Sequence, residues 1–144
     1  MNISASSELV GDQPPPFSLS TVEPGEVFVV RMAGELDIIA VGEVSAALDA
    51  SVSSGLPVIA DATEVRFCCS TVLGVLYNVH VRATKAGRRF VVVTDKRALL
   101  RPLRILGLLD AMTVLPDVDA ALRELELWDL APSDLGFDDQ ARRS

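Results

Sequence analysis

Short apolar runs rich in valine alternate along the chain with segments whose apolar residues recur at helical spacing. This alternation is typical of α/β domains, in which helices cover a mostly parallel sheet. We expect strands at 17–22, 27–33, 56–61, 89–94 and 112–115. Helices are expected at 40–52, between a cap at Ser70 or Thr71 and Gly87, at 99–106 and at 116–128. Turn-forming residues at 23–26 join the first two strands as an antiparallel hairpin. The order predicts an α/β fold with a mixed sheet and about four helices.

Residues with special backbone chemistry mark the expected helix ends. Glycines follow three of the helical segments, at Gly55, Gly87 and Gly107. Glycine accepts the left-handed conformation that ends many helices, so each is expected to be a helix stop. At the start of the second helix, the hydroxyl of Ser70 or Thr71 is expected to act as the cap. Asp95 is expected to cap the third helix, with Pro102 near its first turn.

Length and charge limit the class of protein. The 144 residues suffice for one domain with a sizeable core. We expect a domain at 17–130, a flexible lead-in at 1–16 and a disordered tail at 131–144. The formal net charge of −7 argues against nucleic-acid binding. No apolar run approaches the roughly 18 residues that cross a bilayer, and 1–16 does not resemble a signal peptide. We therefore expect a cytoplasmic protein without a membrane anchor.

The two cysteines, Cys68 and Cys69, are adjacent in the sequence. A disulfide between them would be strained because neighbouring Cα atoms lie about 3.8 Å apart. The pair matches neither a CxxC motif nor zinc-ligand spacing. Successive side chains of an extended segment point to opposite faces, so we expect Cys68 in the core and Cys69 at the surface. A thiol beside a helix N-terminus is often reactive, which makes Cys69 a candidate for redox control.

No group of residues matches a known catalytic, metal-binding or cofactor-binding motif. His80 is the single histidine and has no second metal ligand in a motif. Asp61 ends its expected strand, where it would accept hydrogen bonds from turn amides or support the segment that leads to Ser70. The sequence thus predicts a protein that is not an enzyme, has no cofactor and acts by binding another protein.

Three segments, in this order and spacing, resemble the STAS domain family of bacterial anti-sigma factor antagonists. Val-Arg-Met-Ala-Gly-Glu-Leu-Asp at 30–37 is similar to the family's strand and Gly-Glu-Leu-Asp turn. The segment at 58–76 is similar to a strand followed by the motif Val-x-Phe-Ile-Asp-Ser-Ser-Gly-Leu, and 106–122 is similar to the family's ending. The resemblance covers 17–127 and implies the STAS fold.

The resemblance also implies a function. Such proteins bind an anti-sigma factor, usually a GHKL-type serine kinase, and thereby release a sigma factor. The kinase inactivates the antagonist by phosphorylating the serine after the signature aspartate, and a phosphatase reverses this. That serine position is Ser70 here, with Thr71 as the second candidate. Cys69 replaces the aspartate, and Val72 replaces the glycine. Family members are often monomers, so a monomer is expected when the protein is free.

The partner contacts that the resemblance implies are Glu35, Asp37, Cys69, Ser70 and Thr71. For Glu35 and Asp37 the alternative is a purely local role in turn formation and helix capping. Three alternatives for the function stay open: an antagonist under redox control through Cys69, a constitutive antagonist, and a STAS scaffold or sensor module. A thiol enzyme would need a resolving cysteine or a base, for which the sequence offers Cys68 and His80.

Overall fold

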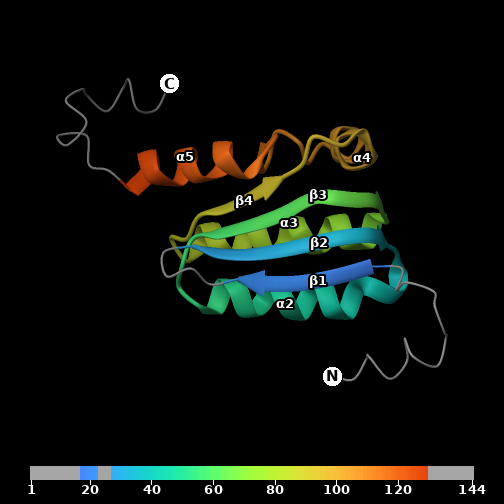
Figure 1. The fold of residues 1–144 in the computed structure, drawn as a ribbon, viewed down its shortest axis with the longest axis horizontal. Coiled ribbons are helices and arrows are strands. Elements are labelled where there is room, and N and C mark those ends of the chain that lie inside the picture. The colour runs from blue at the N-terminus through green and yellow to red at the C-terminus, as the bar shows by residue number, and fades with distance from the viewer. Residues whose placement is uncertain (1–16, 23–26, 130–144) are drawn as a thin grey trace.

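The computed structural model describes residues 17–22 and 27–129. The predicted lead-in at 1–16 and tail at 131–144 lie outside these residues. The strands are β1 (Phe17–Val22), β2 (Phe28–Leu36), β3 (Val58–Cys68), β4 (Phe90–Val93) and β5 (Thr113–Leu115). A 3-10 turn, η1 (Ile38–Ala40), precedes the helices α2 (Val41–Ser53), α3 (Ser70–Lys85), α4 (Arg97–Ile105) and α5 (Val118–Asp129). Figure 1 shows their arrangement.

The strands form one sheet in the order β1-β2-β3-β4-β5. β1 runs antiparallel to β2, while β2–β3, β3–β4 and β4–β5 are parallel pairs. This mixed sheet with its helices confirms the predicted fold class and the antiparallel pairing of the first two strands, while the predicted turn at 23–26 lies outside the described residues. The parallel strands are rich in valine because both of their faces are covered, which favours continuous apolar runs over alternation.

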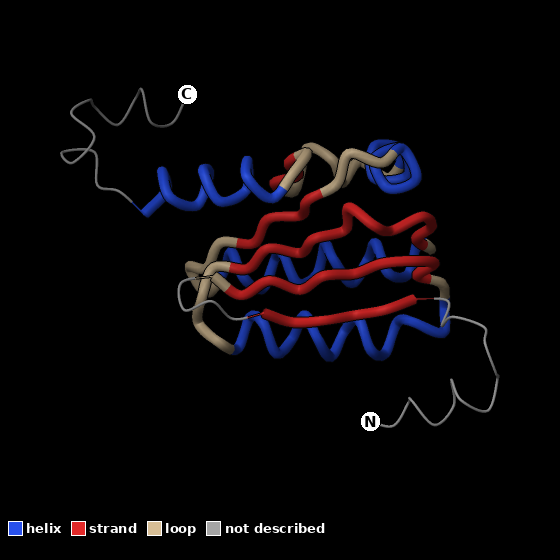
Figure 2. Tube along the Cα trace, viewed as in Figure 1, coloured by secondary structure: helices blue, strands red, loops and turns tan. Residues whose placement is uncertain are grey.

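Helices cover the sheet from both sides. Figure 2 shows α2 and α3 behind the strands, where they pack against each other. On this face the buried residues of α2, α3 and α4 meet alternate strand residues such as Val30 and Val92. On the opposite face, Ala121 and Leu125 of α5 join a second apolar cluster with Val27, Val29, Ile59, Val91 and Val93. Neighbouring residues of one strand thus pack on opposite faces of the sheet, because side chains alternate along a pleated strand.

β3 is longer than the sequence predicts. The apolar pattern indicated a strand that ends near Asp61, whereas β3 continues to Cys68. β2 likewise continues to Leu36, three residues beyond the predicted end at 33. At two register shifts β3 carries one residue more than β2, and Arg66 is the extra residue of the second. Such bulges interrupt the alternation of apolar and polar residues on which strand prediction relies.

The start of α4 also differs from the prediction. Asp95 is not the cap, because the N-cap residue is Lys96. The backbone N–H of Lys96 donates to Thr94 Oγ1 at 3.1 Å in the turn before the helix, and no side chain caps α4 itself. α4 begins earlier than predicted, and Pro102 therefore lies inside the helix rather than in its first turn. The proline removes one backbone donor there, and burial of one face of α4 offsets that cost.

The three predicted helix stops are confirmed. Gly55, Gly87 and Gly107 each follow the C-cap residue of a helix, with φ of 81°, 74° and 75°. Only glycine adopts this region without a steric penalty. These stops turn the chain back towards the sheet for β3, β4 and β5.

Candidate partner-binding surface

The carboxyl ends of β2 and β3 bring together two segments that are far apart in the sequence. Leu36 and Cys68 are partners in the β2–β3 register. The backbone N–H of Cys69 donates a hydrogen bond to Leu36 O at 2.9 Å. Consequently η1, which follows β2, lies beside the start of α3, which follows β3. Binding sites of α/β proteins are usually found at this edge of the sheet.

Three large apolar side chains are exposed at this edge. Ile38 and Ile39 of η1 have 66% and 74% of their surface accessible, and Phe67 of β3 has 48%. Single exposed apolar residues are common on proteins, but a group of them often marks an interaction site. Ser70 and Thr71, the first residues of α3, are exposed beside them. We call Ile38, Ile39, Phe67, Ser70 and Thr71 the carboxyl-edge surface.

α3 begins without a side-chain cap. Its N-cap residue is Cys69, whose carbonyl oxygen accepts a hydrogen bond from Leu73 N–H at 3.1 Å but whose thiol makes no capping bond. The prediction that Ser70 or Thr71 caps this helix is therefore wrong, because both residues lie within the helix. Their hydroxyl groups are free of a capping role and accessible to another protein.

The acidic residues beside this surface make local interactions. Asp37 is the N-cap of η1, and its Oδ1 accepts a hydrogen bond from Ile39 N–H at 3.1 Å. Glu35 Oε2 lies 3.1 Å from Arg66 Nε in an ion pair whose two side chains are largely exposed. Exposed pairs contribute at most about 1 kcal/mol. Glu35 can therefore exchange its pair for a partner's cation at small cost, whereas Asp37 also shapes the turn that carries Ile38 and Ile39.

The adjacent cysteines have opposite environments. Cys68 is buried in the core and Cys69 is half-buried at the start of α3, and both are free thiols. Burial raises the pKa of the Cys68 thiol to about 12, and the neighbouring Cys69 adds to the shift. Cys68 therefore stays protonated at neutral pH and is a poor nucleophile. The expected inward orientation of Cys68 is confirmed, and Cys69 is the more accessible thiol.

Comparison with protein families identifies the domain to which this fold belongs. The STAS domain profile matches residues 18–121, which run from β1 into α5 and include the whole carboxyl-edge surface. The chain belongs to the STAS domain family. The resemblance carried by three short segments of the sequence is thereby confirmed. Among curated proteins, none matches this chain.

Solved structures of anti-sigma factor antagonists share this STAS fold. One from Mycobacterium paratuberculosis is 27% identical, with a TM-score of 0.71 over 77% of this chain and 95% of that chain. SpoIIAA in its unphosphorylated form is 19% identical, with a TM-score of 0.63 over 76% of this chain and 96% of that chain. The Bacillus cell fate determinant SpoIIAA in its phosphorylated form is 19% identical, with a TM-score of 0.59 over 76% and 98%. The two SpoIIAA structures support the fold alone.

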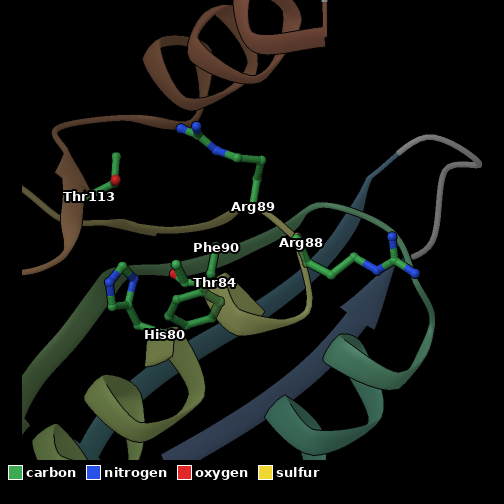
Figure 3. Close-up of a pocket in the computed structure, with 7 residues that line it drawn as sticks. His80, Thr84, Arg88, Arg89, Phe90 and Thr113 are labelled. Atoms are coloured by element: carbon green, nitrogen blue, oxygen red, sulfur yellow. The ribbon is translucent and has the colours of Figure 1, made fainter. Parts of the chain in front are cut away.

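A hollow lies beside the later turns of α3, away from the carboxyl-edge surface. Its lining consists of His80, Thr84, Gly87, Arg88, Arg89, Phe90 and Thr113. Figure 3 shows Arg88 pointing away from His80 and Arg89 reaching towards α5. There, Arg89 Nη2 lies 3.3 Å from Glu124 Oε2. The guanidinium groups of this hollow are thus directed away from His80, and the hollow offers no converging cations for an anionic ligand.

The surroundings of His80 favour its neutral form. Burial lowers its pKa, and a hydrogen bond with the backbone of Ala111 acts more weakly in the opposite direction. The Nδ1 atom is buried without a hydrogen-bond partner. A protonated ring would place a second N–H donor at this buried position, so the neutral ring fits the site better. His80 thus helps to join α3 to the segment before β5.

Asp61 acts within the strands rather than at the carboxyl edge. Its Oδ1 accepts hydrogen bonds from Thr63 N–H at 3.1 Å and Thr63 Oγ1 at 2.7 Å. Arg31 Nε lies 3.7 Å from Asp61 Oδ2. Of the two roles expected for Asp61, the structure shows that of a local acceptor, although it lies inside β3 and not at the end of a strand.

Within residues 17–22 and 27–129, no three histidine, cysteine, aspartate or glutamate side chains gather as metal ligands would. In the same part of the chain, no helix has the length and apolar character needed to cross a membrane.

Sequence reasoning misses the three exposed apolar residues of the carboxyl-edge surface. Ile38 and Ile39 precede the apolar stripe of α2, and this position outside the stripe is the signal that identifies them. Phe67 gives a misleading signal, because strict alternation from the buried Val65 would place it inside. The extra residue Arg66 shifts the alternation, so that Phe67 faces solvent.

Proposed function

We propose that this STAS domain is an anti-sigma factor antagonist that binds its partner through the carboxyl-edge surface and is switched by phosphorylation of Ser70. The observation that carries the proposal is the exposed apolar group of Ile38, Ile39 and Phe67 beside an accessible serine at a helix start. The antagonist from Mycobacterium paratuberculosis, similar over most of this chain, supports the class of partner. Binding would occupy an anti-sigma factor in the cytoplasm and free a sigma factor, with no catalysis by this chain.

Apolar burial supplies the attraction in this proposal. Taking a large apolar side chain fully out of water contributes about 1.5–3 kcal/mol. Ile38, Ile39 and Phe67 each have about half or more of their surface available for such burial. Glu35 and Asp37 add negative charge at the rim, which suits a basic residue of the partner. The proposed contact residues are these five together with Cys69, Ser70 and Thr71.

A phosphate on Ser70 opposes this contact. It adds roughly −1.5 to −2 charge at pH 7. A helix N-terminus stabilises negative charge, so the fold itself tolerates the modification. An apolar partner surface that covers Ile39 does not tolerate the phosphate, because the phosphate would lose its hydration there. A loss of about 3 kcal/mol lowers the affinity more than a hundredfold. Thr71 is the second candidate acceptor, and a phosphatase restores binding.

The experiment combines the purified chain with the GHKL-type anti-sigma kinases of the same cell and ATP. Complex formation is followed by calorimetry, and phosphate incorporation by peptide mass spectrometry. We expect a complex with one kinase and phosphate on Ser70. Ser70→Ala should stay bound in the presence of ATP, while Thr71→Ala, the matched control one residue later, should still take up phosphate on Ser70 and be released. If none of the kinases forms a complex, the proposed function is wrong.

A pair of charge insertions tests the surface itself. Ile39→Asp places a carboxylate in the apolar group and should weaken the complex at least tenfold, about 1.4 kcal/mol. Leu122→Asp is the matched control, since Leu122 is also an exposed apolar residue, 42% accessible, but lies on α5. Equal effects of the two variants would place the contact elsewhere on the domain.

A complex that forms without phosphate on Ser70 identifies a constitutive or thiol-controlled antagonist. The N-cap position held by Cys69, where the resemblance expects aspartate, favours this second candidate. Under thiol control, alkylation should weaken binding of the wild type and leave Cys69→Ser unaffected. Insensitivity of the wild type to alkylation leaves the constitutive antagonist. A stable assembly of this chain without any kinase would instead indicate the scaffold or sensor module.

A further inference from the structure

One face of α4 is strongly basic although the chain is acidic. Arg97, Arg101 and Arg104 recur at i, i+4 and i+7, so they form one stripe along about 10 Å of the helix. All three are exposed, while Leu99 and Leu103 bury the opposite face in the core. Within the described residues the ion pairs belong to other arginines, namely Arg31, Arg66, Arg82 and Arg89. The three guanidinium groups of the stripe thus have no carboxylate partner in the described part of the chain.

Exposed apolar residues adjoin the stripe where α4 ends. Ile105 is 72% accessible and Leu106 is 51% accessible. Ile105, Leu100 and the three arginines line a shallow hollow of about 580 Å³. Asp95 is the single acidic residue in this lining and lies before the helix, at the end opposite to Ile105. The hollow therefore runs from a polar end to an apolar end, with cations along its length.

We infer that this face of α4 is a docking site for an acidic amphipathic helix of a partner protein. A guanidinium donates two parallel hydrogen bonds to a carboxylate, so arginine suits this occupant better than lysine would. Carboxylates at i, i+4 and i+7 of the docked helix face Arg97, Arg101 and Arg104. An apolar residue at the end of the same helix covers Ile105 and Leu106.

Other polyanions fit the face less well. Nucleic acid and anionic bilayers present phosphates to a wide area, and a formal net charge of −7 repels them over the rest of the molecule. Neither supplies a side chain to cover Ile105. The inference stands apart from the proposed function, because no residue of the stripe belongs to the carboxyl-edge surface.

The test measures fluorescence anisotropy of a labelled helical peptide of about 18 residues. The peptide carries glutamates at i, i+4 and i+7 and a leucine at the next position of the same face. Arg97→Gln/Arg101→Gln/Arg104→Gln should weaken its binding to the full chain at least tenfold. The matched control is Lys85→Gln/Arg88→Gln/Arg123→Gln, which removes the same charge from exposed residues elsewhere and should change binding less than twofold. Ile105→Ser should weaken binding about threefold, and added salt should weaken it further.

Specificity comes from a second peptide with the same composition and its glutamates spread around the helix. It should bind the wild type at least tenfold more weakly. Equal binding of the two peptides, or equal effects of the two triple variants, would reduce the result to general electrostatics and overturn the inference. Tighter binding of duplex DNA, of phosphatidylserine vesicles or of a 130–144 peptide through the same arginines would overturn it. Self-association of the chain that the Arg97→Gln/Arg101→Gln/Arg104→Gln variant abolishes would identify a second copy as the occupant. That result would also overturn the inference.

Discussion

The helices α3 and α5 begin differently, although each follows a strand of the same sheet. At α5, Asp117 Oδ1 accepts a hydrogen bond from Ala120 N–H at 2.7 Å. At α3, the thiol of Cys69 makes no such bond. The chain's own carboxylate therefore satisfies a first-turn donor of α5, whereas the first turn of α3 leaves its donors to water or to a partner. The open start is the one beside the exposed Ile38 and Ile39, where the proposed partner binds.

The largest effect expected from this comparison is a difference in thiol reactivity across the start of α3. Cys68, the last residue of β3, has its thiol pKa raised to about 12 by burial, so roughly one thiol in ten thousand is ionised at pH 8. Iodoacetamide should therefore modify Cys69 at least a hundredfold faster than Cys68 in the folded protein. Peptide mass spectrometry measures both rates, and urea should equalise them. Comparable rates without urea would mean that the start of α3 opens readily.

Removing the cap of α5 is expected to cost about 1 kcal/mol of the free energy of unfolding. Asp117→Ala eliminates the acceptor for Ala120 N–H, and urea unfolding measures the loss. Asp119→Ala is the matched control, because Asp119 also lies in the first turn of α5 and contributes through the helix dipole. The control should lose less than Asp117→Ala. An equal loss would show that negative charge, rather than the hydrogen bond, stabilises this helix start.

Adding a cap to α3 should have the opposite sign and a smaller size. Cys69 has the extended backbone of an N-cap residue, so Cys69→Asp is expected to raise the free energy of unfolding by about 0.5–1 kcal/mol. Cys69→Ala, which cannot cap, should show no gain. The aspartate variant also restores the residue expected before Ser70, and faster phosphorylation of Ser70 by a cognate kinase should follow. A stabilised variant with unchanged phosphorylation would separate the cap from kinase recognition.

The sequence predicts those features of the fold that depend on local chemistry. Glycine is nearly required after α2, α3 and α4, so the stops at Gly55, Gly87 and Gly107 follow from residue type alone. The start of α3 is misplaced because Ser70 and Thr71 are good capping residues by type. Its true position is set by where β3 ends.

The end of β3 depends on pairing that local patterns do not contain. Two register shifts against β2 lengthen β3 to Cys68, and these shifts arise between strands that are distant in the sequence. The same shifts turn Phe67 outward and bring Arg66 to Glu35. Phe67 was missed for this reason, whereas Ser70 and Asp37 were identified through the family resemblance.

The smallest expected effect concerns His80, a half-buried residue in the far half of α3. Burial lowers the pKa of His80 in the folded state, so the unfolded chain binds the proton more readily. The stability that His80 contributes is therefore complete above the unfolded pKa of about 6.5 and is lost as pH falls through it towards the folded value. Unfolding of the wild type and His80→Gln, compared between about pH 7 and about pH 5, isolates this contribution from the carboxylates that both share. The stability difference between them should narrow as pH falls. A constant difference would mean that folding leaves the pKa of His80 unchanged, which would contradict its burial against the segment before β5.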